Sequence, residues 1–347
     1  MAGKGNRRNP KTAEERNEEL QQTLERLEEG VRDVFTSEKY SEYLSVMSRF
    51  HNYSFNNCLL IAMQKPEATL VAGYRAWQDK FGRHVRKGEH GIKIISPVVV
   101  KVKPEENDRS GAENPDGKDA AAKRLAGFRL STVFDVSQTE GRELPSLGAN
   151  ELQGDVRDFE SVMDAVRKTS RHPIEFENIE GGAKGYFSHS EPKRIVIQEG
   201  MPQTQTIKTA IHELAHSIMH DFERDDEASP LPDRSTREVQ AESVAFAVSS
   251  WLGLDTSDYS FGYIASWSDG RGTTELKASL DVIRRASHDI IDQISESLDK
   301  SSAAPSRSPE REPVPHRRSL VERAGAARAA AGDARQEPAR QIAVAER

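Results

Sequence analysis

The residues of this sequence best suited to chemistry lie in the segment Ile211-His212-Glu213-Leu214-Ala215-His216-Ser217. On a helix, side chains four positions apart share a face, so His212 and His216 can direct two imidazole nitrogens to one point. Zn²⁺ binds such nitrogens at about 2.0–2.1 Å and in catalytic sites keeps one coordination position open for water. Glu213 lies where a general base for that water is needed. The spacing predicts a Zn²⁺ cofactor with His212 and His216 as ligands and Glu213 as the catalytic base.

A hydrolytic zinc site needs a third protein ligand, and the next helical segment offers two glutamates four positions apart, Glu238 and Glu242. On one helix face, one carboxylate can bind the metal while the other accepts a hydrogen bond from a ligand histidine and fixes its tautomer. We therefore predict Glu238 as the ligand and Glu242 as the supporting carboxylate. Asp221 and Asp225 are alternative ligands, but their polar, acidic run is a poorer place for a rigid ligand.

Hydrolysis of a peptide at this site would also require a donor to the oxyanion. Tyr263, His220 and Tyr186 are candidates, and the sequence does not distinguish them; we carry Tyr263 forward as the predicted donor. The apolar segment 194–198, just before the site helix, reads as a strand. We expect it to pair with an extended peptide substrate by strand addition.

The elements that position these residues can be read from periodicity and capping signals. Leucines and valines at spacings of three and four follow Thr12, which with Glu15 forms a capping box. Pro97 implies a bulge or an edge strand. The predicted helices are 12–34, a second after Ser37, 54–64, 73–78, 156–166, 203–220, 236–252, one carrying Tyr259, Tyr263 and Trp267, and 273–298; the predicted strands are a hairpin over 82–102 and strands at 128–136, 174–176 and 194–197.

These elements predict an α+β fold with two domains. Residues 1–10 and 299–347 are expected to be disordered, because they are polar and lack a period. Residues 11–145 form a first domain of helices and a small antiparallel sheet, with a flexible loop at 103–126. After a linker at 144–154, residues 146–298 form a second domain. Its order of helix, small sheet, site helix and further helix is typical of a minimal metallopeptidase domain.

Composition restricts the setting of this chemistry. The 347 residues carry a formal charge of −7, so any nucleic-acid signal must be local. The one cysteine, Cys58, excludes an internal disulfide and fits a reducing compartment. No secretory signal and no apolar run long enough to span a membrane is present. We therefore expect a cytoplasmic protein without a membrane partner.

A local basic segment suggests a second activity. Between Arg75 and Lys103 the sequence has eight Lys and Arg residues against two acids, interleaved with aromatic residues. Cations with aromatic side chains for base stacking are typical of single-stranded nucleic-acid binding, although a solvated hairpin with Trp77 in the core is the plain alternative. The predicted DNA-binding residues are Tyr74, Arg75, Trp77, Lys80, Arg83, Arg86, Lys87 and Lys93.

Several longer motifs resemble a known family. The segments Tyr53–Asn57, Gly73–Trp77, Gly82–Glu89 and Val133–Thr139 resemble the N-terminal domain of ArdC-type antirestriction proteins, an ssDNA-binding module. The second half is similar to the zincin-like C-terminal domain of the same proteins and to ImmA/IrrE-type metallopeptidases. In the latter, a glutamate three residues before an alanine binds zinc, a pattern that Glu238 and Ala241 match.

The resemblance implies a mobile-element protein that binds incoming single-stranded DNA and protects it from host restriction. Three interpretations remain. The first is a zinc peptidase brought to ssDNA to cut a protein there, such as a restriction or repressor protein. The second is a non-proteolytic protein that coats DNA or inhibits restriction, with a structural metal site. The third is an ImmA-like protease that cleaves a repressor.

Overall fold

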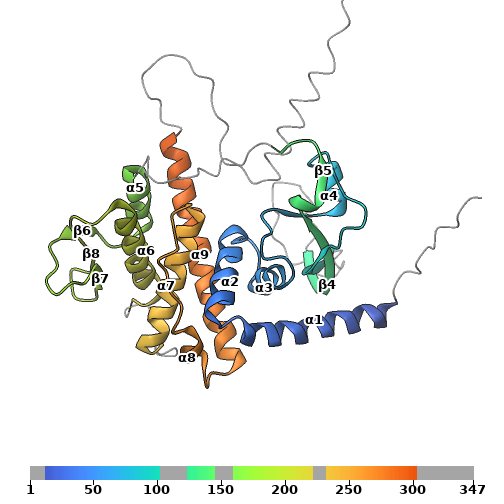
Figure 1. The fold of residues 1–347 in the computed structure, drawn as a ribbon, viewed down its shortest axis with the longest axis horizontal. Coiled ribbons are helices and arrows are strands. Elements are labelled where there is room, and N and C mark those ends of the chain that lie inside the picture. The colour runs from blue at the N-terminus through green and yellow to red at the C-terminus, as the bar shows by residue number, and fades with distance from the viewer. Residues whose placement is uncertain (1–11, 102–122, 145–158, 222–231, 303–347) are drawn as a thin grey trace, which may run out of the picture.

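The computed structural model of the chain describes residues 12–101, 123–144, 159–221 and 232–302. It combines helices with three small sheets, so the predicted α+β class is confirmed. In Figure 1 the N-terminal sheets lie at one side, helices α5–α9 and strands β6–β8 lie at the other, and α2 and α3 lie between them. None of the described helices is long and apolar enough to span a membrane.

Three helices open the fold, as their sequence patterns predicted. Helix α1 (Ala13–Asp33) begins at the predicted capping box: the Glu15 amide donates to Thr12 Oγ1 at 3.1 Å, and the Thr12 amide donates to Glu15 Oε2 at 2.7 Å. Helices α2 (Ser37–Arg49) and α3 (Phe55–Gln64) follow. Their apolar faces are buried in the main core.

The strands of the N-terminal half pair differently from the predicted hairpin over 82–102. Strand β2 (Arg83–Val85) pairs with β5 (Thr139–Gly141), whereas β3 (Ile92–Lys101) pairs with β4 (Lys123–Asp135). The hairpin prediction is therefore wrong. Side-chain bonds hold β2 on β5, because the Arg83 guanidinium donates to the hydroxyl and the carbonyl of Thr139 at 2.7 and 2.9 Å.

Strand β4 is longer than the sequence suggested. Its pairing with β3 extends to Lys123 opposite Lys101, so residues 123–126 of the predicted loop 103–126 are strand. The rest of that loop lies outside the described residues. Strand β3 is an edge of the β1-β4-β3 sheet, with β1 at Val71–Gly73, and its register shifts between Val98 and Val99. Both consequences predicted from Pro97, an edge strand and a bulge, are confirmed.

The second half contains a three-stranded sheet that lies beside the site helix. Strand β8 (Arg194–Gln198) is central, parallel to β6 (Ile174–Glu177) and antiparallel to β7 (Gly185–Ser188). The prediction that segment 194–198 adds a peptide strand is wrong, because both of its edges are already paired. The remaining elements are α4 (Tyr74–Asp79), the 3₁₀ turn Val136–Gln138, α5 (Phe159–Thr169), α6 (Gln203–Met219), α7 (Arg234–Trp251), α8 (Ile264–Ser268) and α9 (Thr273–Ser302).

One contiguous core runs through both halves of the chain. It takes fully buried side chains from α2, such as Leu44 and Met47, and from α7 and α9, such as Val244 and Ile290. A smaller cluster of Leu70, Trp77 and Phe81 lies between α4 and the N-terminal sheets.

The predicted disorder at 1–10 lies outside the described residues, as does nearly all of the linker at 144–154. The predicted tail 299–347 begins too early, because α9 continues to Ser302, and its remainder is not described. The helix predicted to carry Tyr259 is shorter than expected, because α8 covers only Ile264–Ser268 and Tyr259 precedes it.

Candidate functional site

Three predicted metal ligands converge where α6 and α7 pack together. His212 Nε2 and His216 Nε2 are 3.1 Å apart, and Glu238 Oε2 lies 3.7 and 3.6 Å from them. A tetrahedral ion with bonds of about 2.1 Å separates its ligand atoms by about 3.4 Å. The three side chains therefore have the spacing that one shared ion requires, and they form one of two such clusters in the described part of the chain.

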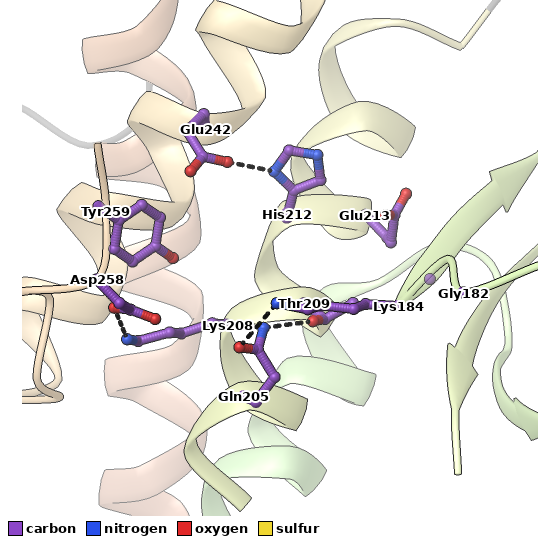
Figure 2. A pocket seen from close by; sticks show the side chains of 11 residues that line it. Gly182, Lys184, Gln205, Lys208, Thr209, His212, Glu213, Glu242, Asp258 and Tyr259 are labelled. Atoms are coloured by element: carbon purple, nitrogen blue, oxygen red, sulfur yellow. Dashed lines mark hydrogen bonds and ion pairs between the residues drawn. The ribbon is translucent and has the colours of Figure 1, made fainter. Parts of the chain in front are cut away.

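The ring orientation of His212 is fixed by the second glutamate of α7. Glu242 Oε2 lies 3.3 Å from His212 Nδ1, so the ring can donate from Nδ1 to this carboxylate. That tautomer leaves the Nε2 lone pair directed at the cluster. Figure 2 shows Glu242 reaching from its helix toward His212.

The ring orientation of His216 is fixed by a chain of hydrogen bonds that the sequence did not reveal. Gln240 Nε2 donates to Ser279 Oγ at 3.1 Å, which turns the amide oxygen toward His220 Nε2 at 2.9 Å. An amide oxygen only accepts, so His220 Nε2 carries the hydrogen and its Nδ1 accepts from His216 Nδ1 at 3.1 Å. His216 therefore also presents its Nε2 lone pair. The added histidine four positions after His216 was the available sequence signal.

In the cluster, the carboxylates favour the charged form of His212 and the histidines favour the charged form of Glu238. Burial opposes protonation of His212, but the Glu238 and Glu242 carboxylates raise its pKa to about 9. Contacts with His212 and His216 in turn hold the pKa of Glu238 well below its usual range. Burial lowers the pKa of His220 to about 4, which keeps this ring neutral and able to accept a hydrogen bond.

Glu213 faces a cleft of about 460 Å³ beside the cluster. The side chain is 8% exposed, and burial raises the pKa of its carboxyl group. Strand β7 approaches α6 closely here, since a Cβ on Gly185 would lie 3.2 Å from Glu213 Cγ and 2.7 Å from Thr209 Cγ2. Figure 2 shows the cleft, whose other lining residues are Gly182, Lys184, Gln205, Lys208, His212, Glu242, Asp258 and Tyr259.

The candidate oxyanion donors lie in different surroundings. Tyr263 is 41% exposed just before α8, and the Glu242 and Glu238 carboxylates add to the burial that raises its pKa. Tyr186 is 39% exposed on β7. His220 is 1% exposed and lies behind His216, so it is unsuitable as an oxyanion donor.

Of the two alternative metal ligands, Asp221 does not join the cluster. Asp221 is buried and accepts from Lys193 Nζ at 2.7 Å, with His172 Nε2 at 3.4 Å. Asp225 lies outside the described residues. Among the described residues, the side chains that come together are His212, His216 and Glu238, and their role as ligands stays a prediction.

The predicted DNA-binding residues divide into surface and structural positions. Tyr74 is 50% exposed, and Arg75, Lys80 and Lys87 are exposed as well. Trp77 is fully buried and its indole N–H donates to the Phe134 carbonyl at 2.9 Å, so its assignment as a DNA-contacting residue is wrong. The indole ring packs against Leu70 and Phe81 in the small cluster, so it is not available for stacking on a base.

The other predicted cations are engaged within the fold. Arg83 donates to Thr139 and to the Arg142 carbonyl. Arg86 donates to Glu89 and to the Ser137 carbonyl, yet 48% of its side chain is exposed. Lys93 donates to Thr132 Oγ1 at 3.0 Å.

Strand β4 adds exposed residues that sequence reasoning missed. Phe128 is 57% exposed and lies between the exposed cations Arg124 and Arg129. The signal was the basic residues on both sides of an aromatic one.

Comparisons with known proteins match the two halves separately. Residues 11–134 match the N-terminal domain of anti-restriction factor ArdC. Residues 169–255 match the IrrE N-terminal-like domain, Peptidase M78. The second match contains every residue of the candidate metal cluster and Glu213.

Individual relatives are distant. The uncharacterized protein pXO2-81 of Bacillus anthracis is 27% identical over 320 residues, which are 83% of this chain and 53% of that protein, so the chain spans about half the length of this curated relative. The metal-free crystal structure of antirestriction ArdC protein from the R388 plasmid is 19% identical with a TM-score of 0.42, over 72% of this chain and 86% of that one. Its Mn(II)-bound structure is 18% identical with a TM-score of 0.39, over 73% and 86%.

The ArdC match covers the basic, aromatic motifs of the N-terminal half, and the Peptidase M78 match covers the motif His212–His216 that follows them. The chain thus contains a segment that matches the ArdC N-terminal domain, followed by a segment that matches the IrrE-type, metallopeptidase-like domain.

Proposed function

We propose that the chain is a metal-dependent peptidase joined to a module that binds single-stranded DNA. The observation that carries the peptidase proposal is the convergence of His212, His216 and Glu238 beside the buried Glu213. Ligands, base and cleft are the parts that hydrolysis of a peptide bond requires.

The side chains present fit a divalent transition-metal ion. Two imidazoles direct lone pairs inward and one carboxylate completes the set, a combination typical of catalytic zinc sites. Zn²⁺ also binds such ligands more strongly than Mn²⁺ does. When bound, the ion would supply Lewis-acid activation of a water molecule and of the scissile carbonyl.

The residues of this chain then have separate roles. Glu213 accepts a proton from the attacking water and delivers it to the leaving amine. Tyr263 donates its hydroxyl hydrogen to the oxyanion. An extended substrate pairs with β7, which is one of the two edge strands of the β6-β8-β7 sheet and contributes Gly185 to the lining of the cleft.

The peptidase proposal is tested by Glu213→Gln. The amide cannot act as a base, so hydrolysis of an unfolded protein substrate should fall at least about 100-fold. Metal content should remain that of the parent, because Glu213 is outside the ligand set. Glu199→Gln, at an exposed carboxylate after β8, should leave both unchanged. Full hydrolysis by metal-loaded Glu213→Gln protein would refute the proposal.

The DNA-binding proposal is supported by exposed aromatic side chains among cations in the ArdC N-terminal domain. Tyr74 and Phe128 are each at least half exposed, and stacking of a base on such a ring contributes about 1–3 kcal/mol. Replacing either with alanine should weaken binding of a fluorescent oligonucleotide about 5- to 150-fold at low salt. Tyr186→Ala removes an exposed aromatic from the other half and serves as the control. Absence of binding by the parent chain at low salt would refute the proposal.

The same Glu213→Gln chain separates the alternatives. If protection of DNA from restriction persists with full DNA binding, the chain acts as a non-proteolytic restriction inhibitor in that role. If protection is lost and DNA binding persists, hydrolysis of a partner protein is required. A repressor-cleaving protease would instead remain active in a chain that carries Tyr74→Ala and Phe128→Ala.

A further inference from the structure

A second cluster of metal-ligating side chains lies between the end of α2 and helix α9. His51 follows α2, and His288 and Asp292 lie one turn apart on α9. One ligand atom from each of these residues lies within 4.8 Å of the other two. The cluster joins distant parts of the sequence and shares no residue with the His212 site.

The spacing within this cluster suits an ion better than direct hydrogen bonds. His51 Nε2 lies 3.6 Å from Asp292 Oδ1, and His288 Nε2 lies 3.6 Å from Asp292 Oδ2. These distances exceed those of hydrogen bonds. They approach the separation of about 3.4 Å between ligands of a tetrahedral ion. In the first site, a single oxygen, Glu238 Oε2, lies at similar distances of 3.7 and 3.6 Å from His212 and His216.

His51 is held in the tautomer that a ligand requires. Its Nδ1 lies 3.2 Å from the Ser48 carbonyl oxygen, to which it donates, so the Nε2 lone pair is directed at the cluster. Asn52 Nδ2 lies 3.2 Å from this lone pair, and an ion would replace that weak donor. The ring also packs edge-on against Trp251, and 14% of the side chain is exposed.

His288 lacks a hydrogen bond on both of its nitrogens within the described part of the chain. Its Nδ1 is buried without a partner, and its Nε2 meets Asp292 only at 3.6 Å. An ion bound at Nε2 would supply a strong interaction to a ring whose one ion-pair partner among the described residues is this distant carboxylate. Asp292 is 50% exposed, so an ion can enter from solvent and complete its coordination with water.

We propose that His51, His288 and Asp292 form a second divalent-metal site, best suited to Zn²⁺, that ties the α2–α3 turn to α9. Two imidazoles and a carboxylate match the preference of this ion. The unfolded chain does not hold these residues together, so binding stabilises the folded chain. The role is structural and independent of the proposed peptidase.

The test uses the untagged full chain carrying His212→Ala and His216→Ala, which removes the first site. After metal is stripped with EDTA, Zn²⁺ is titrated against a chromophoric chelator at pH 7.5. We expect one zinc ion per chain and an unfolding temperature that rises with Zn²⁺. Adding Asp292→Asn should weaken zinc binding at least about tenfold and abolish that rise.

Two further variants complete the experiment. His288→Gln should act like Asp292→Asn, whereas His84→Gln, at an exposed histidine on β2, should leave zinc binding unchanged. The proposal is wrong if the background chain binds no zinc, or if Asp292→Asn leaves its zinc affinity intact. Because Asp292 is half exposed, that variant decides the question even if His288→Gln fails to fold.

Discussion

The contact between His212 and Glu242 predicts how much the second carboxylate of α7 supports the first metal site. Glu242→Ala removes the acceptor 3.3 Å from His212 Nδ1 and frees the ring to rotate or change tautomer. Loss of such a partner lowers metal affinity about 10- to 100-fold, or about 1.4–2.7 kcal/mol. Glu242 is 32% exposed, so water can replace it in part, and we expect a loss near tenfold.

Two matched variants separate orientation from charge. Glu242→Gln keeps an acceptor oxygen, and because a charge-assisted bond is about twice as strong as a neutral one, its loss should be only about threefold. Asp164→Ala removes one negative charge from α5, where this carboxylate pairs with Lys168 on the surface. Its metal affinity should equal that of the parent.

The assay is competition for Zn²⁺ with a chromophoric chelator at pH 7.5. Every chain also carries Asp292→Asn, so that only the first site contributes. Glu238→Ala shows how far zinc affinity falls when a proposed ligand itself is removed. If Glu242→Ala binds zinc as tightly as the parent while Glu238→Ala does not, Glu242 does not support metal binding. The claim that it fixes the tautomer of His212 is then refuted.

Three other substitutions probe the frame of the site and the N-terminal sheets. Gly185→Ala should cost about 1–3 kcal/mol in urea unfolding and should reduce peptidase activity, because its Cβ presses on Glu213; unchanged activity would contradict this. Asp221→Asn removes a charged partner 2.7 Å from the buried Lys193 and should cost about 3–5 kcal/mol, and a loss below 1 kcal/mol would show that other groups replace this carboxylate.

The carboxylate of Asp135 predicts a dependence of stability on pH. Burial opposes its charge, but side-chain and amide donors hold its pKa below the usual range. Its stabilisation is therefore present above about pH 4 and lost as pH falls, and Asp135→Asn should flatten the decline in unfolding free energy between pH 6 and 3.

The sequence was most informative where function depends on local spacing. His212 and His216 share a face because both lie on one helix, and Glu238 and Glu242 share a face for the same reason. Each pair could be predicted without knowing the fold. That the two pairs face each other depends on the packing of α6 against α7, which the motif pattern suggested and the coordinates place at 3.3–3.7 Å.

The failures involve partners far apart in sequence. Strand β2 pairs with β5 across more than fifty residues, and no local pattern near Arg83 specifies Thr139. The hydrogen-bond chain behind His216 likewise joins three separate helical segments through Gln240 and Ser279. Trp77 was misassigned because an aromatic residue among cations has the same sequence pattern whether it is buried or exposed.

The two segments that match different family models share one hydrophobic core. Helix α7, which bears both site glutamates, packs against α2 of the N-terminal half. The Tyr40 hydroxyl lies 2.7 Å from Ser243 Oγ, next in sequence to Glu242, and both side chains are fully buried. Tyr40, Leu44 and Met47 are each fully buried, and each such side chain contributes about 1.5–3 kcal/mol.

The α2 contribution is therefore comparable with the about 5–15 kcal/mol that stabilises a whole domain. A fragment of residues 146–347 should lack a cooperative unfolding transition in circular dichroism and should bind Zn²⁺ weakly. Tyr40→Phe in the full chain, which removes only a hydroxyl, should cost about 1 kcal/mol and leave metal affinity unchanged. A fragment that unfolds cooperatively and binds zinc like the full chain would show instead that α7 holds its glutamates without α2, and the two halves would then be independent in stability.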